Sequence, residues 1–259
     1  MLTLKRIEEH PMKEVMIVPG ASRGIGAAIA KMAAARGYAV CVNYKSRRDA
    51  AEQVVSQIRA AGGEAIAVRA DVSQEGETVR LFETVDEELG TVTALVINAG
   101  ILETQMRVDE MDAARVARIM QANVVGPFIC AREAVRRMST RLGGHGGVIV
   151  NISSAAARLG SPGEYVDYAA SKGAMDTMTI GLAKEVAAEG IRVNGVRPGV
   201  IYTEIHASGG EPARVDRVAA KVPMGRGGQV DEVAAAVLWL CADEASYATG
   251  AIIDVAGGI

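Results

Sequence analysis

Short aliphatic runs alternate with longer amphipathic stretches from Val15 to the end of the chain. The apolar runs are continuous, as in strands that are buried on both faces, and several amphipathic stretches end at a glycine, a common helix stop. The pattern predicts an α/β fold in which helices cover both faces of a parallel sheet. We expect strands at residues 15–18, 39–43, 65–69, 94–97, 148–152, 192–196 and 252–255. We expect helices at residues 25–36, 50–60, 77–89, 111–123, 127–141, 168–188, 214–221 and 230–241.

The chain of 259 residues is short enough for one domain of this type. No internal repeat, low-complexity segment or Pro/Ser-rich linker divides it. We therefore expect residues 1–259 to form a single Rossmann-type doubly wound domain with a seven-stranded parallel sheet, preceded by an N-terminal extension at residues 1–14. Residues 200–223 form one long irregular insertion after an expected strand, the place of a substrate loop or lid, although a plain surface loop fits the same sequence.

The composition and charge describe an ordinary globular protein. Hydrophobic residues make up 49% and charged residues 23% of the chain, and the formal net charge of -3 gives no basic footprint for nucleic acid. Residues 1–14 contain no uninterrupted apolar stretch of the kind that a signal peptide needs, and no segment has the composition of a membrane span. We expect a cytoplasmic protein whose partners are small molecules.

The cysteines and histidines show no metal-binding pattern. The cysteines are far apart in apolar runs, which is typical of reduced core thiols in the cytoplasm. The histidines are scattered without ligand spacing, so we expect surface or loop residues and no metal site. The cysteines are Cys41, Cys130 and Cys241, and the histidines are His10, His145 and His206.

Three glycines, Gly20, Gly24 and Gly26, follow the first expected strand and open the first expected helix. In this context glycines permit a tight turn, and they let backbone N–H groups and the helix N-terminus approach a pyrophosphate. A glycine triplet alone is weak evidence for nucleotide binding, whereas a strand before it and a helix after it make the motif specific. The sequence therefore predicts a dinucleotide-binding loop.

The end of the second expected strand bears on the choice of dinucleotide. NAD-binding proteins commonly place a carboxylate about twenty residues past the glycines, but this chain has Asn43 and Tyr44 there. Positive charge is available from Arg23, Lys45 and Arg47, and it suits a 2′-phosphate. We favour NADP(H) and keep NAD(H) open, because the same basic residues also fit the solvated start of a helix.

Asp71 and Val72 follow the third expected strand. The Asp71 side chain and the Val72 backbone are candidates for bonding the adenine ring. A helix N-cap near Ser73 is the competing explanation.

Tyr168 and Lys172 are one helical turn apart and share a face of the expected helix. The ammonium of Lys172 should lower the proton affinity of the phenol and make it a usable acid or base near neutral pH. Without further context the two residues could also be an ordinary surface pair.

Downstream of the glycine loop, the chain carries a set of short motifs in a fixed order. They are Asn98-Ala99-Gly100, Asn123, Ser153-Ser154, Tyr168-x-x-x-Lys172 and Arg197-Pro198-Gly199. In these motifs and their order the chain resembles the short-chain dehydrogenase/reductase family, from about residue 16 to the C-terminus. It is most similar to the subgroup that contains glucose dehydrogenases and 3-oxoacyl carrier-protein reductases. The resemblance implies an enzyme that acts on a CH–OH group with NAD or NADP.

The resemblance also implies a role for each member of a catalytic tetrad. Tyr168 would be the general acid in carbonyl reduction and the base in alcohol oxidation, tuned by Lys172, which also holds the nicotinamide ribose. Ser154, rather than Ser153, would bond the substrate oxygen. Asn123 would seat a water that connects the lysine to solvent.

The remaining site residues follow from the motifs and their neighbours. The predicted cofactor contacts are Gly20, Ser22, Arg23, Gly24, Ile25, Gly26, Asn43, Tyr44, Lys45, Arg47, Asp71, Val72, Asn98, Ala99, Gly100, Tyr168, Lys172, Pro198, Gly199, Ile201 and Thr203. The predicted substrate contacts are Ser154, Ala156, Arg158, Tyr165 and Tyr168.

Two positions depart from the family pattern. The family usually has a threonine just before the first loop glycine and a second asparagine before Asn98, whereas this chain has Pro19 and Ile97. The first and fourth strands are neighbours in the doubly wound order. We expect an apolar Pro19/Ile97 contact to replace a polar bridge between the two strand ends.

The expected activity is NADPH-dependent reduction of a ketone or aldehyde by a homotetramer, the assembly that the resemblance implies. Reduction of a 3-oxoacyl carrier protein and oxidation of a sugar such as glucose at C1 are the alternatives. The acidic helix end at Ala187-Ala188-Glu189 weakens the first, because an acidic carrier protein needs basic contacts. A nucleotide-sensing regulator is the non-enzymatic alternative, and such a protein would be expected to lose Tyr168 or Lys172.

Overall fold

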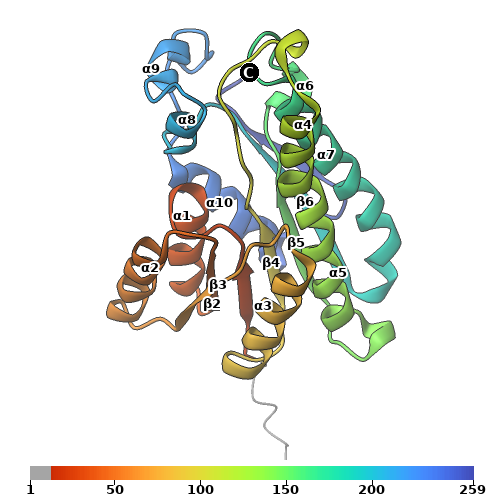
Figure 1. The fold of residues 1–259 in the computed structure, drawn as a ribbon. Coiled ribbons are helices and arrows are strands. Elements are labelled where there is room, and N and C mark those ends of the chain that lie inside the picture. Colours follow the sequence, from red (N-terminus) through yellow and green to blue (C-terminus); the bar gives the residue numbers. More distant parts are fainter. Residues whose placement is uncertain (1–12) are drawn as a thin grey trace, which may run out of the picture.

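The computed structural model describes residues 13–259, which form one seven-stranded parallel sheet (Figure 1). The strands lie in the order β3-β2-β1-β4-β5-β6-β7, and every neighbouring pair is parallel. The predicted Rossmann-type doubly wound sheet is confirmed, and residues 1–12 of the predicted N-terminal extension lie outside the described residues. The strands are β1 (Val15–Val18), β2 (Ala39–Tyr44), β3 (Ala65–Arg69), β4 (Ala94–Ile97), β5 (Gly147–Ile152), β6 (Ile191–Pro198) and β7 (Ile252–Val255).

Helices cover both faces of the sheet and divide the core into two layers (Figure 1). In β1, Met16 and Val18 pack toward one layer, and Val15 and Ile17 pack toward the other, because successive strand residues point to opposite faces. All four side chains are fully buried, which explains the continuous apolar run. The first layer contains α1 (Gly24–Ala34), α2 (Arg48–Ala60) and α10 (Val230–Cys241), and the second contains α3 (Glu75–Glu88), α5 (Gly126–Met138) and α7 (Val166–Val186).

The predicted break between two helices after Asn123 is wrong. Instead, α4 (Ala113–Met120) continues through a π-helical turn (Gln121–Val125) directly into α5. A proline in the first turn of α5 made the sequence look like a new helix, but its missing N–H is tolerated where the hydrogen-bond register changes. A Cβ on Gly126 would lie 3.0 Å from the carbonyl oxygen of Val72, so this glycine lets the helix approach the end of β3.

The chain between β6 and α10 contains two short helices, α8 (Ile205–Ser208) and α9 (Arg214–Ala219), which lie above α1 in Figure 1. The sequence predicted α9 but not α8, because four residues are too few to show a helical period. The same is true of α6 (Ala156–Leu159), directly after β5. Residues 13–259 also contain four single 3-10 turns, namely Val108–Glu110, Thr140–Leu142, Ala187–Glu189 and Asp243–Ala245.

The three cysteines lie buried in these layers as free thiols, as the sequence predicted. Burial raises the pKa of Cys130 to about 12 and that of Cys241 to about 12. These thiols are therefore protonated at neutral pH and act as apolar packing groups. Within residues 13–259, no helix combines the length and the apolar content that crossing a membrane would take.

Candidate active site

Two adjoining hollows lie at the carboxyl ends of the strands, where parallel α/β sheets bind ligands. We call them the glycine-loop groove and the tyrosine pocket, and Ile25, Asn98, Gly100, Thr203 and Ile205 line both. The glycine-loop groove is also lined by Gly20, Ser22, Arg23, Gly24, Gly26, Asn43, Tyr44, Lys45, Ser46, Arg47, Ala70, Asp71, Val72, Ser73, Ala99, Ile101, Ala122 and Glu204. The tyrosine pocket is also lined by Leu102, Ile152, Ser153, Ser154, Ala155, Ala156, Leu159, Ser161, Tyr165, Tyr168, Lys172, Pro198, Gly199, Val200, Ile201, His206, Arg214 and Ile259.

The glycine loop has the geometry of an anion cradle. Gly20 and Gly24 adopt positive φ angles of 72° and 56°, which L side chains rarely tolerate. A Cβ on Gly26 would lie 2.5 Å from Asn98 Nδ2, so only glycine fits there. Within the part of the chain that the structure describes, no side chain caps the N-terminus of α1, and its first turn contains no acidic residue. Free N–H groups and the helix dipole therefore favour a negative group at this point, and the residues fit a dinucleotide pyrophosphate.

The side chain of Asn43 holds the glycine loop in place through hydrogen bonds. Its Oδ1 accepts a hydrogen bond from the Gly20 N–H (3.2 Å), and its Nδ2 donates to the carbonyl oxygens of Val68 and Ala70, each at 3.1 Å. The side chain is 1% exposed, although the residue lines the groove. Asn43 thus ties the glycine loop to the end of β3, a positioning task that the sequence did not reveal.

The side chain of Asn98 forms a polar bridge between the strand ends of β1 and β4, and the expected apolar Pro19/Ile97 contact stays a prediction. The amide Nδ2 of Asn98 donates to the carbonyl oxygens of Pro19 (3.2 Å) and Gly20 (3.0 Å). Because these acceptors belong to the backbone, the bridge does not depend on which side chain stands at position 19.

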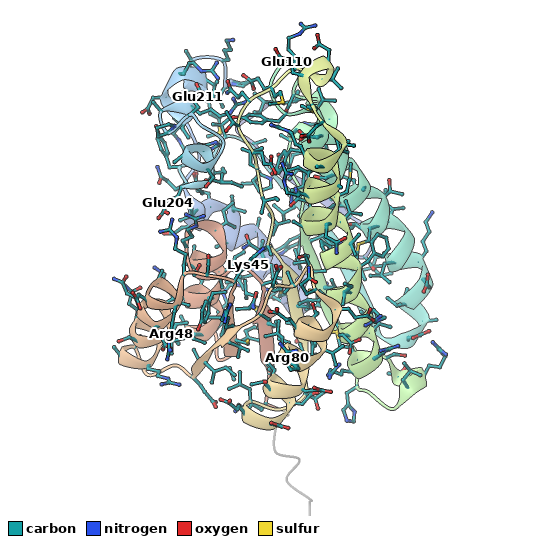
Figure 2. All side chains as sticks on the ribbon, viewed as in Figure 1. Lys45, Arg48, Arg80, Glu110, Glu204 and Glu211 are labelled. Carbon is teal, nitrogen blue, oxygen red and sulfur yellow. The ribbon has the colours of Figure 1, made fainter. Side chains whose placement is uncertain are left out.

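Two of the basic residues predicted to favour a 2′-phosphate already have carboxylate partners. Arg23 Nη1 lies 2.7 Å from Glu204 Oε2, and Lys45 Nζ lies 2.7 Å from Asp71 Oδ2. In Figure 2, Lys45 lies near the strand ends and Glu204 near α8. Burial alone would raise the pKa of Asp71, but hydrogen bonds from Lys45 and Ser73 outweigh it and hold that pKa below its usual range. Asp71 is thus an anion joined to Lys45 and to a turn at Ser73.

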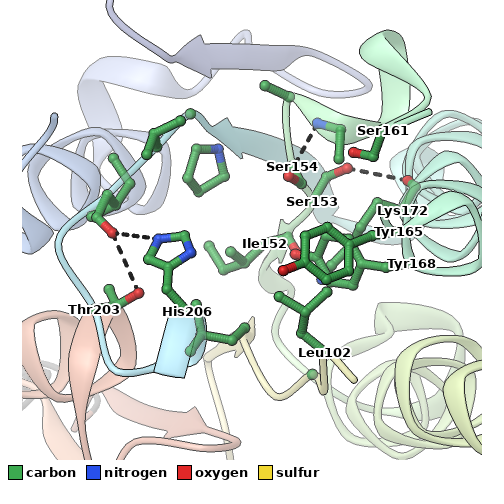
Figure 3. Close-up of a pocket in the computed structure, with 18 of the residues that line it drawn as sticks. Leu102, Ile152, Ser153, Ser154, Ser161, Tyr165, Tyr168, Lys172, Thr203 and His206 are labelled. Carbon is green, nitrogen blue, oxygen red and sulfur yellow. Dashed lines mark hydrogen bonds between the residues drawn. The ribbon is translucent and has the colours of Figure 1, made fainter. Parts of the chain in front are cut away.

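Tyr168 and Lys172 share a face of α7, as predicted, and meet the end of β5 in the tyrosine pocket (Figure 3). Lys172 Nζ lies 5.6 Å from the centre of the Tyr168 ring and donates a hydrogen bond to the Ile152 carbonyl oxygen at 2.8 Å. The two serines after β5 differ. Ser153 Oγ donates to the Lys172 carbonyl oxygen (3.1 Å), whereas Ser154 Oγ accepts from the Ala156 N–H (3.1 Å) and keeps its own proton to donate.

The electrostatics of this pair differ from the sequence expectation. Burial raises the pKa of Tyr168 to about 12, against a smaller opposite effect of Ser154, so the expected lowering below the ordinary value is wrong for the protein alone. Burial also lowers the pKa of Lys172 to about 8. At neutral pH Tyr168 is therefore a protonated acid, and Lys172 is a cation that has lost most of its hydration.

Asn123, the remaining member of the predicted tetrad, lies fully buried in the π turn. Its Oδ1 accepts from the Ile101 N–H (2.7 Å), and its Nδ2 donates to the Ile101 carbonyl oxygen (3.0 Å) and to Ser171 Oγ (3.1 Å). A Cβ on Gly100 would lie 3.3 Å from Asn123 Oδ1 and 3.5 Å from Lys172 Nζ. The structure therefore brings Asn123 beside Lys172 and uses its side chain to fix the loop after β4.

Four of the five predicted substrate contacts line the tyrosine pocket, namely Ser154, Ala156, Tyr165 and Tyr168. Arg158 is a correction. Its Nη2 donates to the Ile259 carbonyl oxygen (2.8 Å) and lies 3.2 Å from Asp254 Oδ2. Ala156 and Leu159 of the same short helix line the pocket, whereas Arg158 is held by these C-terminal partners and does not.

The sequence missed several residues that line the tyrosine pocket, above all His206 and Arg214. His206 lies on α8 and was expected to be an ordinary loop residue. Its Nε2 lies 2.9 Å from the carbonyl oxygen of Ile201 (Figure 3), and burial lowers its pKa. Its position a few residues after the Pro198-Gly199 motif was the only available signal.

The chain is similar to known proteins over nearly its whole length. A family model described as Enoyl-(Acyl carrier protein) reductase matches residues 20–259. The chain is 57% identical to the "Uncharacterized oxidoreductase YgfF" of Escherichia coli (strain K12), over 94% of this chain and 99% of the relative. It is 37% identical to "Glucose 1-dehydrogenase 2" of Bacillus subtilis (strain 168), over 94% of this chain and 93% of the relative. A solved structure, the blue fluorescent protein from a metagenomic library in complex with NADPH, superimposes with a TM-score of 0.86 at 34% identity and covers 95% of this chain and 97% of that one.

An anion cradle at a helix N-terminus beside a tyrosine–lysine pair defines a nicotinamide-dependent oxidoreductase, because hydride transfer to a carbonyl needs a held dinucleotide and a proton donor. The chain belongs to the short-chain dehydrogenase/reductase family, and the predicted family is confirmed. Its members act on CH–OH groups with NAD or NADP.

Proposed function

We propose that the protein reduces a ketone or aldehyde with NADPH. The observation that carries this proposal is the convergence of Tyr168, Ser154 and Lys172 in a pocket that opens beside the glycine loop. The pKa of Tyr168, about 12, makes the phenol a proton donor at neutral pH. Carbonyl reduction needs this protonated form, and alcohol oxidation needs the phenolate.

The proposed mechanism divides the work among three side chains. The Ser154 hydroxyl donates a hydrogen bond to the carbonyl oxygen and orients it. Tyr168 passes its phenolic proton to that oxygen as negative charge develops there. The Lys172 ammonium stabilises the phenolate that remains. When bound, the nicotinamide supplies the hydride that reduces the carbonyl carbon.

Asn123 has a supporting role in the proposed mechanism. Its side chain is committed to Ile101 and Ser171, and it lies beside Lys172. By fixing this part of the π turn it would hold a water path that returns a proton to Tyr168 through Lys172. The π turn supports this role, because such turns recur at functional sites.

NADP is the proposed cofactor because three basic residues line the glycine-loop groove. Arg23, Lys45 and Arg47 all border it, and Arg47 is exposed. The 2′-phosphate would displace Glu204 from Arg23 and Asp71 from Lys45. The NADPH complex of the fluorescent protein supports the same preference.

The remaining features of the proposal concern organisation. We propose one domain, in which residues 200–223 form the substrate lid. Contacts between this segment and the residues just before α7 support the lid, namely Tyr165 Oη with the Gly209 carbonyl oxygen (3.2 Å) and Arg214 with Glu164 (2.5 Å). A homotetramer and a cytoplasmic location are proposed from the family and from the buried free thiols.

Sugar oxidation is the second candidate and is supported by the glucose dehydrogenase relative. Reduction of a 3-oxoacyl carrier protein is less favoured, because the end of α7 leads into Glu189, whose carboxylate is bound by Ser139 and Arg141. A purely nucleotide-sensing protein would need no acid in the pocket, yet Tyr168 and Lys172 are both present.

Replacement of Tyr168 by Phe tests the proposal. NADPH oxidation by wild-type protein would be followed by absorbance with a panel of ketones and aldehydes, and sugars would be tried in reverse with NADP. We expect Y168F to lower kcat by about 10²- to 10⁴-fold, the usual contribution of a general acid, and to leave the Kd for NADPH nearly unchanged. Tyr202→Phe is the matched control, because the Tyr202 hydroxyl bonds Asp216 outside the pocket. Turnover by Y168F at the wild-type rate would refute the assignment.

A further inference from the structure

Residues 256–259, which we call the tail segment, follow β7 and reach the tyrosine pocket. Ile259 lines this pocket together with Tyr168, and it is half-buried. Its carbonyl oxygen accepts a hydrogen bond from Arg158, and its N–H donates one to the Ala256 carbonyl oxygen (3.4 Å). Because both backbone groups have partners in the chain, the aliphatic side chain is what Ile259 offers to a molecule in the pocket.

Close contacts hold the start and the middle of the tail segment. A Cβ on Gly199 would lie 2.7 Å from the Ala256 Cα, so the segment begins packed against the loop that follows β6. The Gly257 carbonyl oxygen accepts a hydrogen bond from the Met224 N–H (3.1 Å). Gly257 has a φ angle of 65°, and a Cβ on it would lie 2.6 Å from Val222 Cγ1. The tail segment is therefore fixed between the end of β6 and the last part of the lid.

Arg158 holds the far end of the tail segment. Its Nη2 donates to the Ile259 carbonyl oxygen at 2.8 Å and lies 3.2 Å from Asp254 Oδ2. Arg158 belongs to α6, whose first residue donates its N–H to Ser154 Oγ (3.1 Å). Figure 1 shows the C-terminal end of the chain beside this helix. A side chain that does not itself line the pocket thus links Ile259 to the helix that follows Ser154.

The size and charge of the tyrosine pocket restrict the substrate. The pocket has a volume of about 180 Å³, below the roughly 300–1,000 Å³ of pockets that hold drug-sized ligands. Among the described residues that line it, only Lys172 and Arg214 are charged. Lys172 serves Tyr168 in the proposed mechanism, and Arg214 is bound to Glu164 (2.5 Å) and Glu211 (3.3 Å). A charged substituent would lose its hydration without gaining a free partner, so the pocket favours a small, uncharged substrate.

We propose that Ile259 is a specificity-determining residue that limits the length of the substrate, and that Arg158 is the positioning residue that holds it in place. The preferred substrates are then uncharged aliphatic ketones or aldehydes with a short apolar substituent. Because the tail segment is held at three points, a longer substituent cannot push Ile259 aside. The inference rests on the proposed carbonyl reduction and names its substrate class.

Four single substitutions separate the wall from the side chain that positions it. Ile259→Ala removes most of the side chain but keeps the carbonyl oxygen that Arg158 binds, and Ile259→Trp enlarges the side chain. Arg158→Met keeps the aliphatic stem and loses the donor, whereas Arg158→Lys keeps a donor. Arg226→Met is the matched control. Arg226 is 48% exposed, close to the 45% of Arg158, and it pairs with Glu232 (2.6 Å) outside the tyrosine pocket.

The experiment measures kcat/KM with NADPH for unbranched methyl ketones and aldehydes of four to ten carbons. The readout is the value for each longer compound divided by that for 2-butanone or butanal. This ratio should fall with length in wild-type protein. I259A should raise it about tenfold for the longest compounds, the usual effect of adding or removing a methylene-sized space in an apolar pocket, and I259W should lower it.

Arg158 is tested with the same ratio. R158M should raise the ratio for long compounds as I259A does, because the released tail segment no longer resists a long substituent. R158K and R226M should keep the wild-type profile. The double variant R158M/I259A should show no further increase over I259A, because both changes remove the same wall.

The outcomes are distinguishable. An unchanged length profile in I259A and I259W, or equal losses on short and long compounds, overturns the role of Ile259. A wild-type profile in R158M, or a loss of kcat that is the same at every length, overturns the role of Arg158, because a purely structural role predicts one of these results. A wild-type protein that prefers the longest compounds, or that reduces other carbonyl compounds but no member of the series, overturns the inference and leaves the proposed function intact. If it reduces no carbonyl compound, the proposed function itself fails.

Discussion

Replacing Glu204 by Gln should strengthen NADPH binding, because this carboxylate competes with the cofactor for Arg23. The two side chains form an ion pair at 2.7 Å, and they are 37% exposed for Arg23 and 61% exposed for Glu204. A 2′-phosphate that uses Arg23 must break this pair. E204Q removes the competing charge and keeps the shape of the side chain.

The size of the effect follows from the exposure of the pair. An exposed ion pair contributes about 0.2–1 kcal/mol, so E204Q should lower the Kd for NADPH by about 1.4- to 5-fold. Arg23→Ala should act in the opposite direction. A charge-assisted bond to phosphate contributes about 1.5–3 kcal/mol, from which the lost ion pair is subtracted, so R23A should raise the Kd about tenfold.

Titration calorimetry at fixed ionic strength would measure both cofactors with each variant. NADH is the control, since it lacks the 2′-phosphate, and its Kd should change by less than about twofold in R23A and E204Q. In the R23A background, E204Q should have no further effect on NADPH, because no Arg23 is left to release. Equal changes for NADH and NADPH, or a tighter NADPH complex of E204Q in the R23A background, would refute the reasoning.

Two further predictions concern the buried charges of α7. Burial lowers the pKa of Lys172 from its ordinary value of 10.5 to about 8. Between these two pH values Lys172 is protonated in the unfolded chain and unprotonated in the folded protein. The free energy of unfolding therefore rises with pH in this range. Urea unfolding would measure this effect. Between about pH 7.5 and pH 10 the free energy of unfolding of wild-type protein should rise by up to about 3 kcal/mol relative to that of Lys172→Met. Parallel pH profiles of the two proteins would contradict this. The second prediction concerns Arg115, whose Nε lies 2.8 Å from Asp167 Oδ2, with the side chains 5% and 2% exposed. Arg115→Met should lower the free energy of unfolding by about 3–5 kcal/mol, because it leaves the buried Asp167 carboxylate uncompensated. The double variant R115M/D167N should recover most of this stability. An R115M variant as stable as wild type would argue against a charged pair.

The sheet was predictable because each strand must be buried on both faces. Only an unbroken apolar run satisfies that condition at Val15–Val18 and Ala94–Ile97, so the strands are legible one segment at a time. The helices of one turn were not legible, because a four-residue element such as α8 has no period. The continuous helix through Asn123 was missed for a related reason, since a proline reads as a boundary unless the π turn is known.

The site residues also differ in whether local sequence or distant contacts place them. Tyr168 and Lys172 are four residues apart on one helix, so local spacing alone put them on one face. Arg158 does not line the pocket, because its side chain binds the Ile259 carbonyl oxygen, which comes from a distant part of the chain. Asn43 lined the groove as expected, but its task of holding Gly20 requires the contact between β2 and the glycine loop.

The sequence by itself determined the doubly wound sheet and the glycine loop, because these depend on local periodicity and on residues near one another in the chain. The tetrad was expected from the resemblance of its motifs to a known family. Only the tertiary structure decided the pairing of Arg23 with Glu204, which are 181 positions apart, the place of His206 in the tyrosine pocket, and a pKa for Tyr168 above rather than below its ordinary value. Charge and desolvation act through space and fall off within a few ångströms. What a side chain does therefore depends on neighbours that distant segments supply, and those become known only when the chain is folded.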